Sequence, residues 1–539
     1  MHAPSPALPH ADAPAWRWAC AAAVAWGALL RLDGWRASRG LWFDETTVAT
    51  SILGRSLAEL RPPFDNIQMA PLPFWAQSWL SLHLFGFSER VLRLPPLLWG
   101  LLTLALGARL AWRLQRPRTA ALSAAMLATA PALLQYSDEL KPYAMDAGIS
   151  VGLLLAATAL RRGTLSIPAL AALGVGGLLC SFPAPLVLAG VGLAALAARP
   201  RAWPALVGTG ALWAGVAAGG VAWYRSQTQL GRLDWYFSFG YWTPERFWDR
   251  AGFVGEILLY GAGVPYWPAW TLPAGLGLGV GLVVLARRAG LASAVLLAAP
   301  LGALIAASVA GAYPISTRTA LFALPVLVLL LAEALGALLD RLPARLQALG
   351  AAFLGVAALQ APGLRPVVWA SGMRPSTGAL REPIAALTAA LRPGDGVYLP
   401  PRSVPGWMVY TTDWDQPDRA RLAQAERWGT TIYSSTPDQR RYLGLDPREG
   451  LTQARGHPEI LGQTSGLFQR WPIGSAYQQR DLGWLDAELA RILTLDLPGL
   501  GLLCVADDEK LCPALQEALR ARGWTCAPIR GDQAVRCGP

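Results

Sequence analysis

Residues Leu291–Ala312 read LASAVLLAAPLGALIAASVAGA, an uninterrupted apolar run. A helix needs about 20 such residues to cross the hydrocarbon core of a bilayer. The composition of the whole chain points the same way, because 53% of its 539 residues are hydrophobic and only 15% are charged. Soluble proteins average about 25% charged residues. We therefore expect a polytopic α-helical membrane protein.

Apolar runs of similar length recur from the N-terminus to about Pro362, and eleven can be counted. The fifth and sixth are short enough to form one re-entrant hairpin. The eleven runs are Trp16–Leu32, Leu94–Trp112, Ala120–Gln135, Tyr143–Leu160, Leu165–Cys180, Ala184–Ala198, Leu206–Tyr224, Trp270–Ala286, Leu291–Ala312, Ala320–Leu339 and Leu346–Ala361.

Arginines in the short loops between these runs predict the orientation of the chain, because Lys and Arg beside a helix end resist translocation. Five arginine-bearing loops alternate along the chain, which places the N-terminus inside and the large loops outside. The outer segments then include the first loop, about Asp33–Arg93, and everything beyond Pro362. The arginines are Arg113, Arg116 and Arg118; Arg161 and Arg162; Arg199 and Arg201; Arg287 and Arg288; Arg341 and Arg345.

The C-terminal part of the chain has a different composition, with mixed polar and apolar residues and Pro-Gly turns. We therefore divide the chain into a membrane module, residues 1–362, and an extracytoplasmic α/β domain, residues 363–539. Four of the six cysteines lie in this domain, which suits disulfides in an oxidising compartment. Of the three possible pairings we favour Cys504 with Cys512 and Cys526 with Cys537.

Short elements are predicted inside this domain from its hydrophobic patterns. The expected helices are Pro383–Leu391, Trp484–Leu493 and Pro513–Arg522, and the expected strands are Val397–Leu399, Gly501–Val505 and Cys526–Ile529.

Two adjacent carboxylates, Asp44 and Glu45, follow the first apolar run at the start of the first outer loop. One interpretation is structural: Asp44 caps a helix that opens at Thr46. The other is catalytic: a carboxylate at the membrane surface acts as general base toward an acceptor hydroxyl. The residues by themselves do not decide between the two.

The motifs around this pair resemble those of the GT-C membrane glycosyltransferases. The resemblance rests on Asp44-Glu45, the segment Ala70-Pro71-Leu72-Pro73, the segments Leu84-Phe85-Gly86 and Leu92-Arg93-Leu94-Pro95, and Tyr136-Ser137-Asp138-Glu139-Leu140-Lys141-Pro142-Tyr143. It is strongest toward the branch of dolichyl-phosphate-mannose protein mannosyltransferases and aminoarabinose transferases. It implies an inverting transfer of a sugar from a polyprenyl-phosphate donor, with Asp44 next to the chemistry and Glu45 beside it.

The same resemblance suggests where the donor phosphate binds. Family members often carry a basic residue just before the Pro-Leu segment, where this chain has Met69-Ala70. The phosphate ligand must therefore come from elsewhere, and Lys141 matches a basic position of related enzymes. Arg318 is a candidate second phosphate contact, because it is an arginine on the side predicted to be outside. Both Lys141 and Arg318 have a simpler alternative, in which the side chain extends to the lipid headgroups, and Arg318 could also pair with a loop carboxylate. The further candidates are Arg55 and Arg61 as cations, and Asp138 and Glu139 as a second acidic or acceptor site.

Several classes of chemistry lose support from the sequence. We find no P-loop and no dinucleotide-binding glycine pattern, and the four histidines make a histidine-rich metal site improbable. No cofactor is required, although a divalent cation held by carboxylates is compatible with the motifs. The expected partners are a polyprenyl-phosphate-linked sugar, a glycan, lipid or protein acceptor, and membrane lipids, but no nucleic acid. The rival classes are a transporter or flippase of a lipid-linked saccharide, and a polysaccharide polymerase or ligase.

These inferences place the protein in the bacterial cytoplasmic membrane, with the active site and the C-terminal domain on the extracytoplasmic side. We predict that a reporter fused after Pro539 is active only outside the cytoplasm, because the arginine-rich loops alternate without exception. Paired fusions of alkaline phosphatase and green fluorescent protein test this. Activity confined to the cytoplasm would contradict the predicted orientation.

Overall fold

The computed structural model describes residues 13–53, 55–60, 68–227, 241–242, 268–343, 379–393, 395–399, 403–411, 459–462, 489–490, 493, 497–504, 511–531 and 533–539. The chain forms two compact units. The helical unit comprises Met1–Ala37, Arg93–Trp223 and Phe237–Val367, and the mixed unit comprises Ser38–Leu92, Tyr224–Tyr236 and Val368–Pro539. The first outer loop thus groups with the C-terminal segment. The boundary expected near residue 362 stays a prediction, because it falls outside the described residues.

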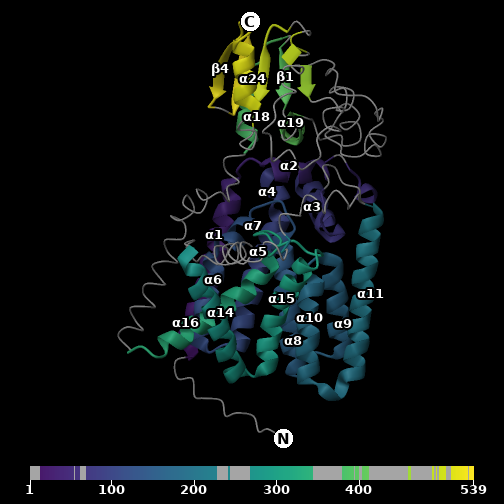
Figure 1. Ribbon diagram of the computed structural model, residues 1–539, viewed down its shortest axis with the longest axis vertical. Helices are drawn as coiled ribbons and strands as arrows, with labels where there is room; N and C mark the ends of the chain where they lie inside the picture. Colours follow the sequence, from purple (N-terminus) through teal and green to yellow (C-terminus); the bar gives the residue numbers. More distant parts are fainter. Residues whose placement is uncertain are drawn as a thin grey trace. The chain divides into compact units, whose positions relative to one another are not determined.

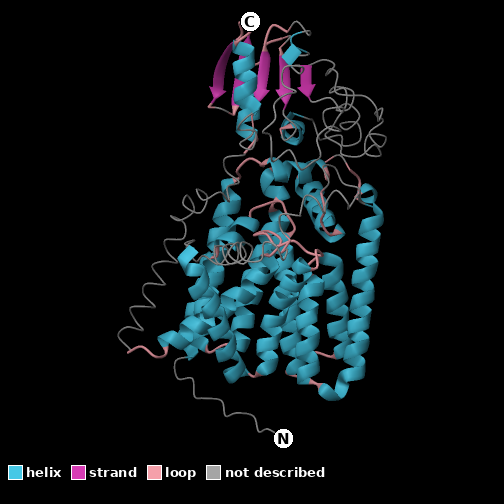
Figure 2. Ribbon diagram, viewed as in Figure 1, coloured by secondary structure: helices cyan, strands magenta, loops and turns pink. Residues whose placement is uncertain are grey.

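The helical unit consists of long helices packed side by side, and short turns join several of them (Figures 1 and 2). Its core is a continuous cluster of Leu, Ala and Val side chains between the helices. The helices are α1 (Ala13–Ala37), α5 (Leu94–Leu114), α6 (Pro117–Thr129), α7 (Pro131–Tyr136), α8 (Tyr143–Arg161), α9 (Ile167–Cys180), α10 (Ala184–Ala198), α11 (Trp203–Gln227), α14 (Pro268–Ala289), α15 (Leu291–Val309) and α16 (Leu324–Leu339).

Many of these helices have the length and composition of membrane spans. Within the described part of the chain, 5 segments are long and apolar enough to cross a bilayer: Leu94–Leu114, Tyr143–Arg161, Pro200–Ser226, Leu291–Val309 and Leu321–Leu339. Two shorter apolar helices, α9 and α10, accompany them. The fold class predicted from the sequence, a polytopic helical membrane protein, is confirmed. The count of eleven spans stays a prediction, since Leu346–Ala361 is not described.

One predicted helix is interrupted. The sequence suggested a single span over Ala120–Gln135, whereas the structure divides it between α6 and α7 at Ala130. Pro131 begins α7 and has no N–H, so it cannot bond the carbonyl of Leu127 four residues earlier. The buried guanidinium of Arg31 donates to that carbonyl at 3.3 Å and to the carbonyl of Ala128 at 3.2 Å. An arginine from α1 therefore satisfies the backbone at the break.

The mixed unit contains helices from two distant parts of the sequence and a five-stranded sheet. The strand order is β2-β1-β3-β5-β4; β1 runs parallel to β2 and β3, while β5 is antiparallel to β3 and β4. The helices are α2 (Phe43–Thr50), α3 (Leu72–Phe85), α4 (Glu89–Leu92), α18 (Arg381–Ala390), α19 (Val404–Thr411) and α24 (Leu511–Arg520). The strands are β1 (Gly396–Leu399), β2 (Glu459–Gly462), β3 (Leu500–Leu503), β4 (Thr525–Arg530) and β5 (Ala534–Gly538).

Helices cover both faces of this sheet, and β3 shows why. Successive side chains of a strand point to opposite faces. Leu500 and Leu502 belong to a cluster with residues of α24, whereas Gly501 faces α18, where an added Cβ would lie 2.9 Å from Leu387. The α/β class predicted for this domain is therefore confirmed.

The short elements of this domain were predicted unevenly. Helices α18 and α24 and strands β1, β3 and β4 match predicted segments within a few residues, whereas β2, β5 and α19 were not predicted. The predicted helix over Trp484–Leu493 lies mostly outside the described residues. Both favoured disulfides, Cys504–Cys512 and Cys526–Cys537, are present.

A buried ion pair connects the start of β1 to β5. Two nitrogens of Arg536 donate to the carboxylate of Asp395, at 2.8 and 3.0 Å, and the Arg392 N–H donates to it at 2.8 Å. Burial opposes ionisation, but the bonds from Arg536 and Arg392 outweigh it and hold the pKa of Asp395 below its ordinary value. The pair therefore stabilises the sheet when Asp395 is ionised.

We predict that Asp395→Asn destabilises this domain by about 2 kcal/mol, since it removes charge-assisted hydrogen bonds. In the wild type, the stabilisation from this ion pair is fully present above the ordinary carboxyl pKa of about 4. It disappears as the pH falls through the lowered pKa. Chemical unfolding of the full chain at several pH values, followed by a probe in this domain, measures the effect, with the exposed Glu517→Gln as control. Equal stability of Asp395→Asn and wild type at pH 7 would contradict the assigned role.

Candidate active site

The start of α2 determines how the two adjacent carboxylates are presented. Helix α2 begins at Phe43, with Trp42 at its N-cap. The Glu45 carboxylate turns back to accept a hydrogen bond from the Trp42 N–H at 3.3 Å, and it forms an ion pair with Arg39 at 3.1 Å. The Glu45 side chain is 0% exposed and that of Arg39 is 17% exposed. Glu45 is thus held in place and neutralised by a nearby cation.

Asp44 lies in a different environment, although it is the adjacent residue. It is the second residue of the helix and is partly exposed, whereas Glu45 is buried. The structural interpretation, in which Asp44 caps a helix that opens at Thr46, is wrong. The helix starts three residues earlier, and Glu45 supplies the side-chain cap. Of the two carboxylates, Asp44 is therefore the more exposed.

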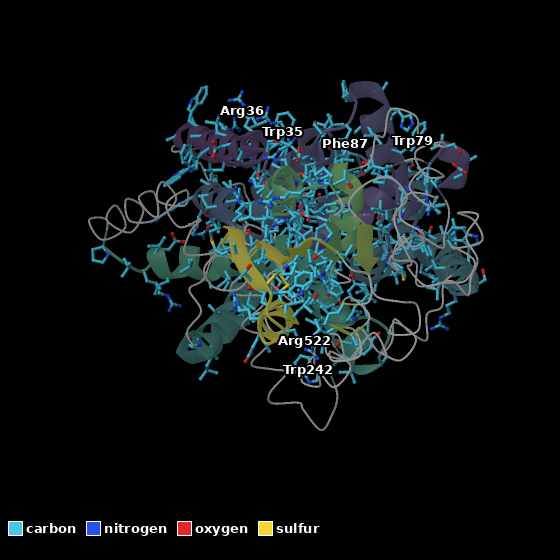
Figure 3. All side chains as sticks on the ribbon, turned by 90° about the horizontal axis from the view of Figure 1, so that it is seen from above. Trp35, Arg36, Trp79, Phe87, Trp242 and Arg522 are labelled. Carbon is cyan, nitrogen blue, oxygen red and sulfur yellow. A yellow bond between two sulfur atoms is a disulfide. The ribbon has the colours of Figure 1, made fainter. Side chains whose placement is uncertain are left out.

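Arg55 and Arg61, the two candidate cations of the first outer loop, differ in how the structure describes them. Arg55 is buried, and its backbone carbonyl accepts a hydrogen bond at 2.8 Å from the indole of Trp79, which is labelled in Figure 3. Arg61 lies outside the described residues. The segment Met69-Ala70 also lies in the mixed unit, and the Ala70 carbonyl accepts hydrogen bonds from Trp75 and Tyr224.

The turn between α7 and α8, in the helical unit, carries three of the predicted residues. Lys141 is only 5% exposed and Glu139 is also buried, whereas Asp138 is partly exposed. Glu139 accepts a hydrogen bond from Gln135 at 3.3 Å, and its backbone carbonyl accepts the Lys141 N–H at 2.7 Å. The turn therefore places a cation and two carboxylates within four residues.

Arg318 lies in a second turn of the same unit, between α15 and α16. Ser316 and Thr319 exchange hydrogen bonds across this turn, and Tyr313 donates to the Thr319 carbonyl at 3.0 Å. Burial raises the pKa of Tyr313 well above its ordinary value, and the nearby Asp146 and Tyr143 raise it further. Asp146 and Tyr143 belong to the first turn of α8. The turns of Lys141 and Arg318 therefore border the same end of α8.

Sequence reasoning missed Arg39, the ion-pair partner of Glu45. Arg39 lies six residues before Glu45 and outside helix α2, so the pair does not have the regular spacing of a helical ion pair. It also missed Tyr410, whose hydroxyl accepts the Leu41 N–H. Glu89 and Arg381 were missed as well; they form an ion pair, and Glu89 also accepts a hydrogen bond from Tyr410. Arg381 and Tyr410 come from a part of the chain more than 300 residues away, so no local pattern could have identified them.

No metal centre marks the site among the residues that the structure describes. No three His, Cys, Asp or Glu side chains gather there as candidate metal ligands. A hollow of about 580 Å³ lies beside α9 and α11, lined by Ser166, Arg199 and apolar residues. The sequence predicts that these helix ends face the cytoplasm, so we do not assign the hollow to the outer site.

Part of the chain matches a family model, and the whole chain resembles solved structures in its fold. Residues 68–219 match the family model described as dolichyl-phosphate-mannose-protein mannosyltransferase. No sequence among the curated proteins matches the chain. Among solved structures, the crystal structure of ArnT from Cupriavidus metallidurans bound to undecaprenyl phosphate superposes with a TM-score of 0.51 and 16% identity, over 95% of this chain and 97% of that chain.

This chain has the fold of the GT-C membrane glycosyltransferases. The family match and the shared fold together confirm the resemblance inferred from the motifs. An oligosaccharyltransferase from Archaeoglobus fulgidus also superposes, with a TM-score of 0.44 and 13% identity over 72% of this chain and 61% of that chain. The family match includes the turn with Asp138, Glu139 and Lys141 and begins after Asp44. The role of Asp44 in this GT-C protein must therefore be argued from its own geometry.

Proposed function

We propose that this GT-C protein transfers a sugar from a polyprenyl-phosphate donor to an acceptor hydroxyl outside the cytoplasm, with inversion at the anomeric carbon. The observation that carries the proposal is the contrast between the two adjacent carboxylates. Glu45 is buried and paired with Arg39, while Asp44 is partly exposed at the start of α2. A general base must reach the proton that it removes, and only Asp44 meets this condition.

The reaction is a single displacement. The acceptor oxygen attacks the anomeric carbon from the side opposite the phosphate, and its proton passes to Asp44. The bond between the anomeric carbon and the phosphate oxygen breaks, so the lipid leaves as a monophosphate. Glu45 caps α2 and so holds Asp44 in position, and Arg39 balances the charge of Glu45. Because the leaving group is a monophosphate ester, one or two cations suffice to stabilise it.

The candidate cations for the phosphate are Lys141 and Arg318. Both lie in turns that border the start of α8, where the sequence predicts the outer surface of the membrane. Cations bind phosphate oxygens through charge-assisted hydrogen bonds, and the planar fork of arginine can bind two oxygens at once. The crystallised ArnT holds undecaprenyl phosphate, which supports a lipid-phosphate ligand for this fold. Arg55 and Arg61 are the reserve candidates.

The two acidic residues of the turn, Asp138 and Glu139, are proposed for different tasks. Asp138 is the more exposed of the two, and Glu139 is buried and bonded to Gln135. We assign Asp138 to the recognition of acceptor or sugar hydroxyls and Glu139 to holding the turn. The protein would act in the bacterial cytoplasmic membrane with this chemistry on the extracytoplasmic side, without a required cofactor. We propose a hexose or a pentose as the transferred sugar.

Replacement of Asp44 tests its role as the general base. Asp44→Asn should reduce transfer by about 100-fold to 10,000-fold, the range for loss of a positioned base. Folding should survive, since Glu45 and not Asp44 caps α2. Binding of undecaprenyl phosphate should persist, because cations hold the phosphate. The measurement is sugar transfer by the purified variant, with the lipid-linked sugar fraction of cells that lack the protein as donor. A folded Asp44→Asn protein with the wild-type rate would disprove the assigned role.

Replacement of Lys141 and Arg318 tests their role as ligands of the donor phosphate. Lys141→Ala and Arg318→Ala should each weaken binding of undecaprenyl phosphate about tenfold or more, because a hydrogen bond to a charged group contributes about 1.5–3 kcal/mol. Direct binding to the purified variants measures the effect. Arg201→Ala is the control, since this exposed arginine belongs to a loop predicted to be cytoplasmic. Normal affinity in both variants would shift the assignment to Arg55 and Arg61.

A further inference from the structure

The main chain just before Asp44 is bonded on both sides by residues near the other end of the sequence. The Leu41 N–H donates to the hydroxyl of Tyr410 at 2.6 Å, and the Leu41 carbonyl accepts the Leu380 N–H at 3.0 Å. Leu41 is fully buried. Both backbone polar groups of a residue three positions before Asp44 are therefore satisfied by the C-terminal segment.

Side chains close these two contacts into a ring of hydrogen bonds. The Tyr410 hydroxyl donates to Glu89 at 3.2 Å, and the same Glu89 oxygen forms an ion pair with Arg381 at 3.0 Å. Arg381 follows Leu380, which bonds Leu41. The Tyr410 hydroxyl thus uses both its donor and its acceptor capacity, and phenylalanine could replace neither.

Packing reinforces this ring. Helix α19, which carries Tyr410, packs directly against α2, which carries Asp44. Trp407 and Val409 of α19 are buried. A Cβ on Gly40 would lie 3.0 Å from the Cβ of Arg381, so the two chain segments touch at their backbones. The start of α2 therefore packs against the C-terminal segment, and its position depends on that segment.

We propose that Tyr410, Glu89 and Arg381 are positioning residues that hold Asp44 in place for proton transfer, so that the C-terminal domain is part of the catalytic machinery. The proposal rests on the function proposed above. The Glu45 cap fixes the helix from Trp42 onward, and the ring fixes the residue before it. Misplacement of a catalytic group by about 1 Å can reduce a rate about 100-fold, even when the altered residue touches no substrate.

The test is Tyr410→Phe in the purified full-length protein. The probe is the lipid-linked sugar fraction extracted from cells that lack the protein, in which its donor accumulates. The rate is normalised to the sites that bind undecaprenyl phosphate, which removes any effect of a smaller folded fraction. We expect kcat to fall at least tenfold while the KM for the donor changes less than twofold, because the phosphate ligands lie elsewhere in the chain. A purely structural role would leave the rate per binding site unchanged.

Thr411→Val is the matched control. Thr411 is the next residue of α19, and its hydroxyl bonds only the Trp407 carbonyl of its own helix among the described contacts. This variant should keep the wild-type kcat. Arg381→Gln breaks the ring at another point, so it should lower kcat in the same way. The double variant should be little worse than either single variant, since one break already opens the ring.

A folded Tyr410→Phe protein with the wild-type kcat per binding site would overturn the positioning role. If Tyr410→Phe does not fold, Arg381→Gln decides by the same criterion. Wild type and Asp44→Asn are measured beside them. If the wild type transfers sugar, Asp44→Asn does not, and Tyr410→Phe does, only the positioning proposal fails. If the wild type does not use the donor fraction, the proposed function fails, and the positioning role with it.

Discussion

The ion pair between Arg39 and Glu45 is the interaction on which the proposed chemistry depends. A carboxylate that is fully buried must be paired or hydrogen-bonded, because removing an ion from water is costly. Glu45 meets this requirement with Arg39 and the Trp42 N–H, and the same bonds start helix α2. Two adjacent carboxylates thereby acquire different roles. Glu45 has a structural role, whereas Asp44 is partly exposed.

A comparable constraint acts in the helical unit, where backbone groups have no water to bond. Unsatisfied carbonyls are expensive in the lipid interior. The helix break at Pro131 would leave the Leu127 carbonyl without a donor, and the buried Arg31 supplies one. The break allows the short helix α7 to lead into the turn with Lys141. A buried arginine in α1 is therefore explained by the backbone that it satisfies.

The sequence predicted the features that depend on local pattern. Apolar runs identified the long helices, and the clustering of four cysteines near the C-terminus indicated disulfides, whose favoured pairing is the one observed. Features that depend on distant partners could not be predicted. The start of α2 was misplaced because acidic residues such as Asp44 and Glu45 are both common near a helix N-terminus, and the contacts that distinguish them form only in the folded chain. Strand β5 was missed because a short strand shows its identity mainly through its pairing with β3 and β4. The ring at Leu41 joins residues 369 positions apart.

The proposed reaction is a direct displacement in which a carboxylate removes the acceptor proton and a lipid monophosphate leaves. The measurement that tests this most directly is the anomeric configuration of the product, compared with that of the donor by nuclear magnetic resonance. Mass spectrometry of the released lipid completes it. The account predicts an inverted anomeric centre and polyprenyl monophosphate as the second product. A retained configuration, or release of a polyprenyl diphosphate, would contradict it.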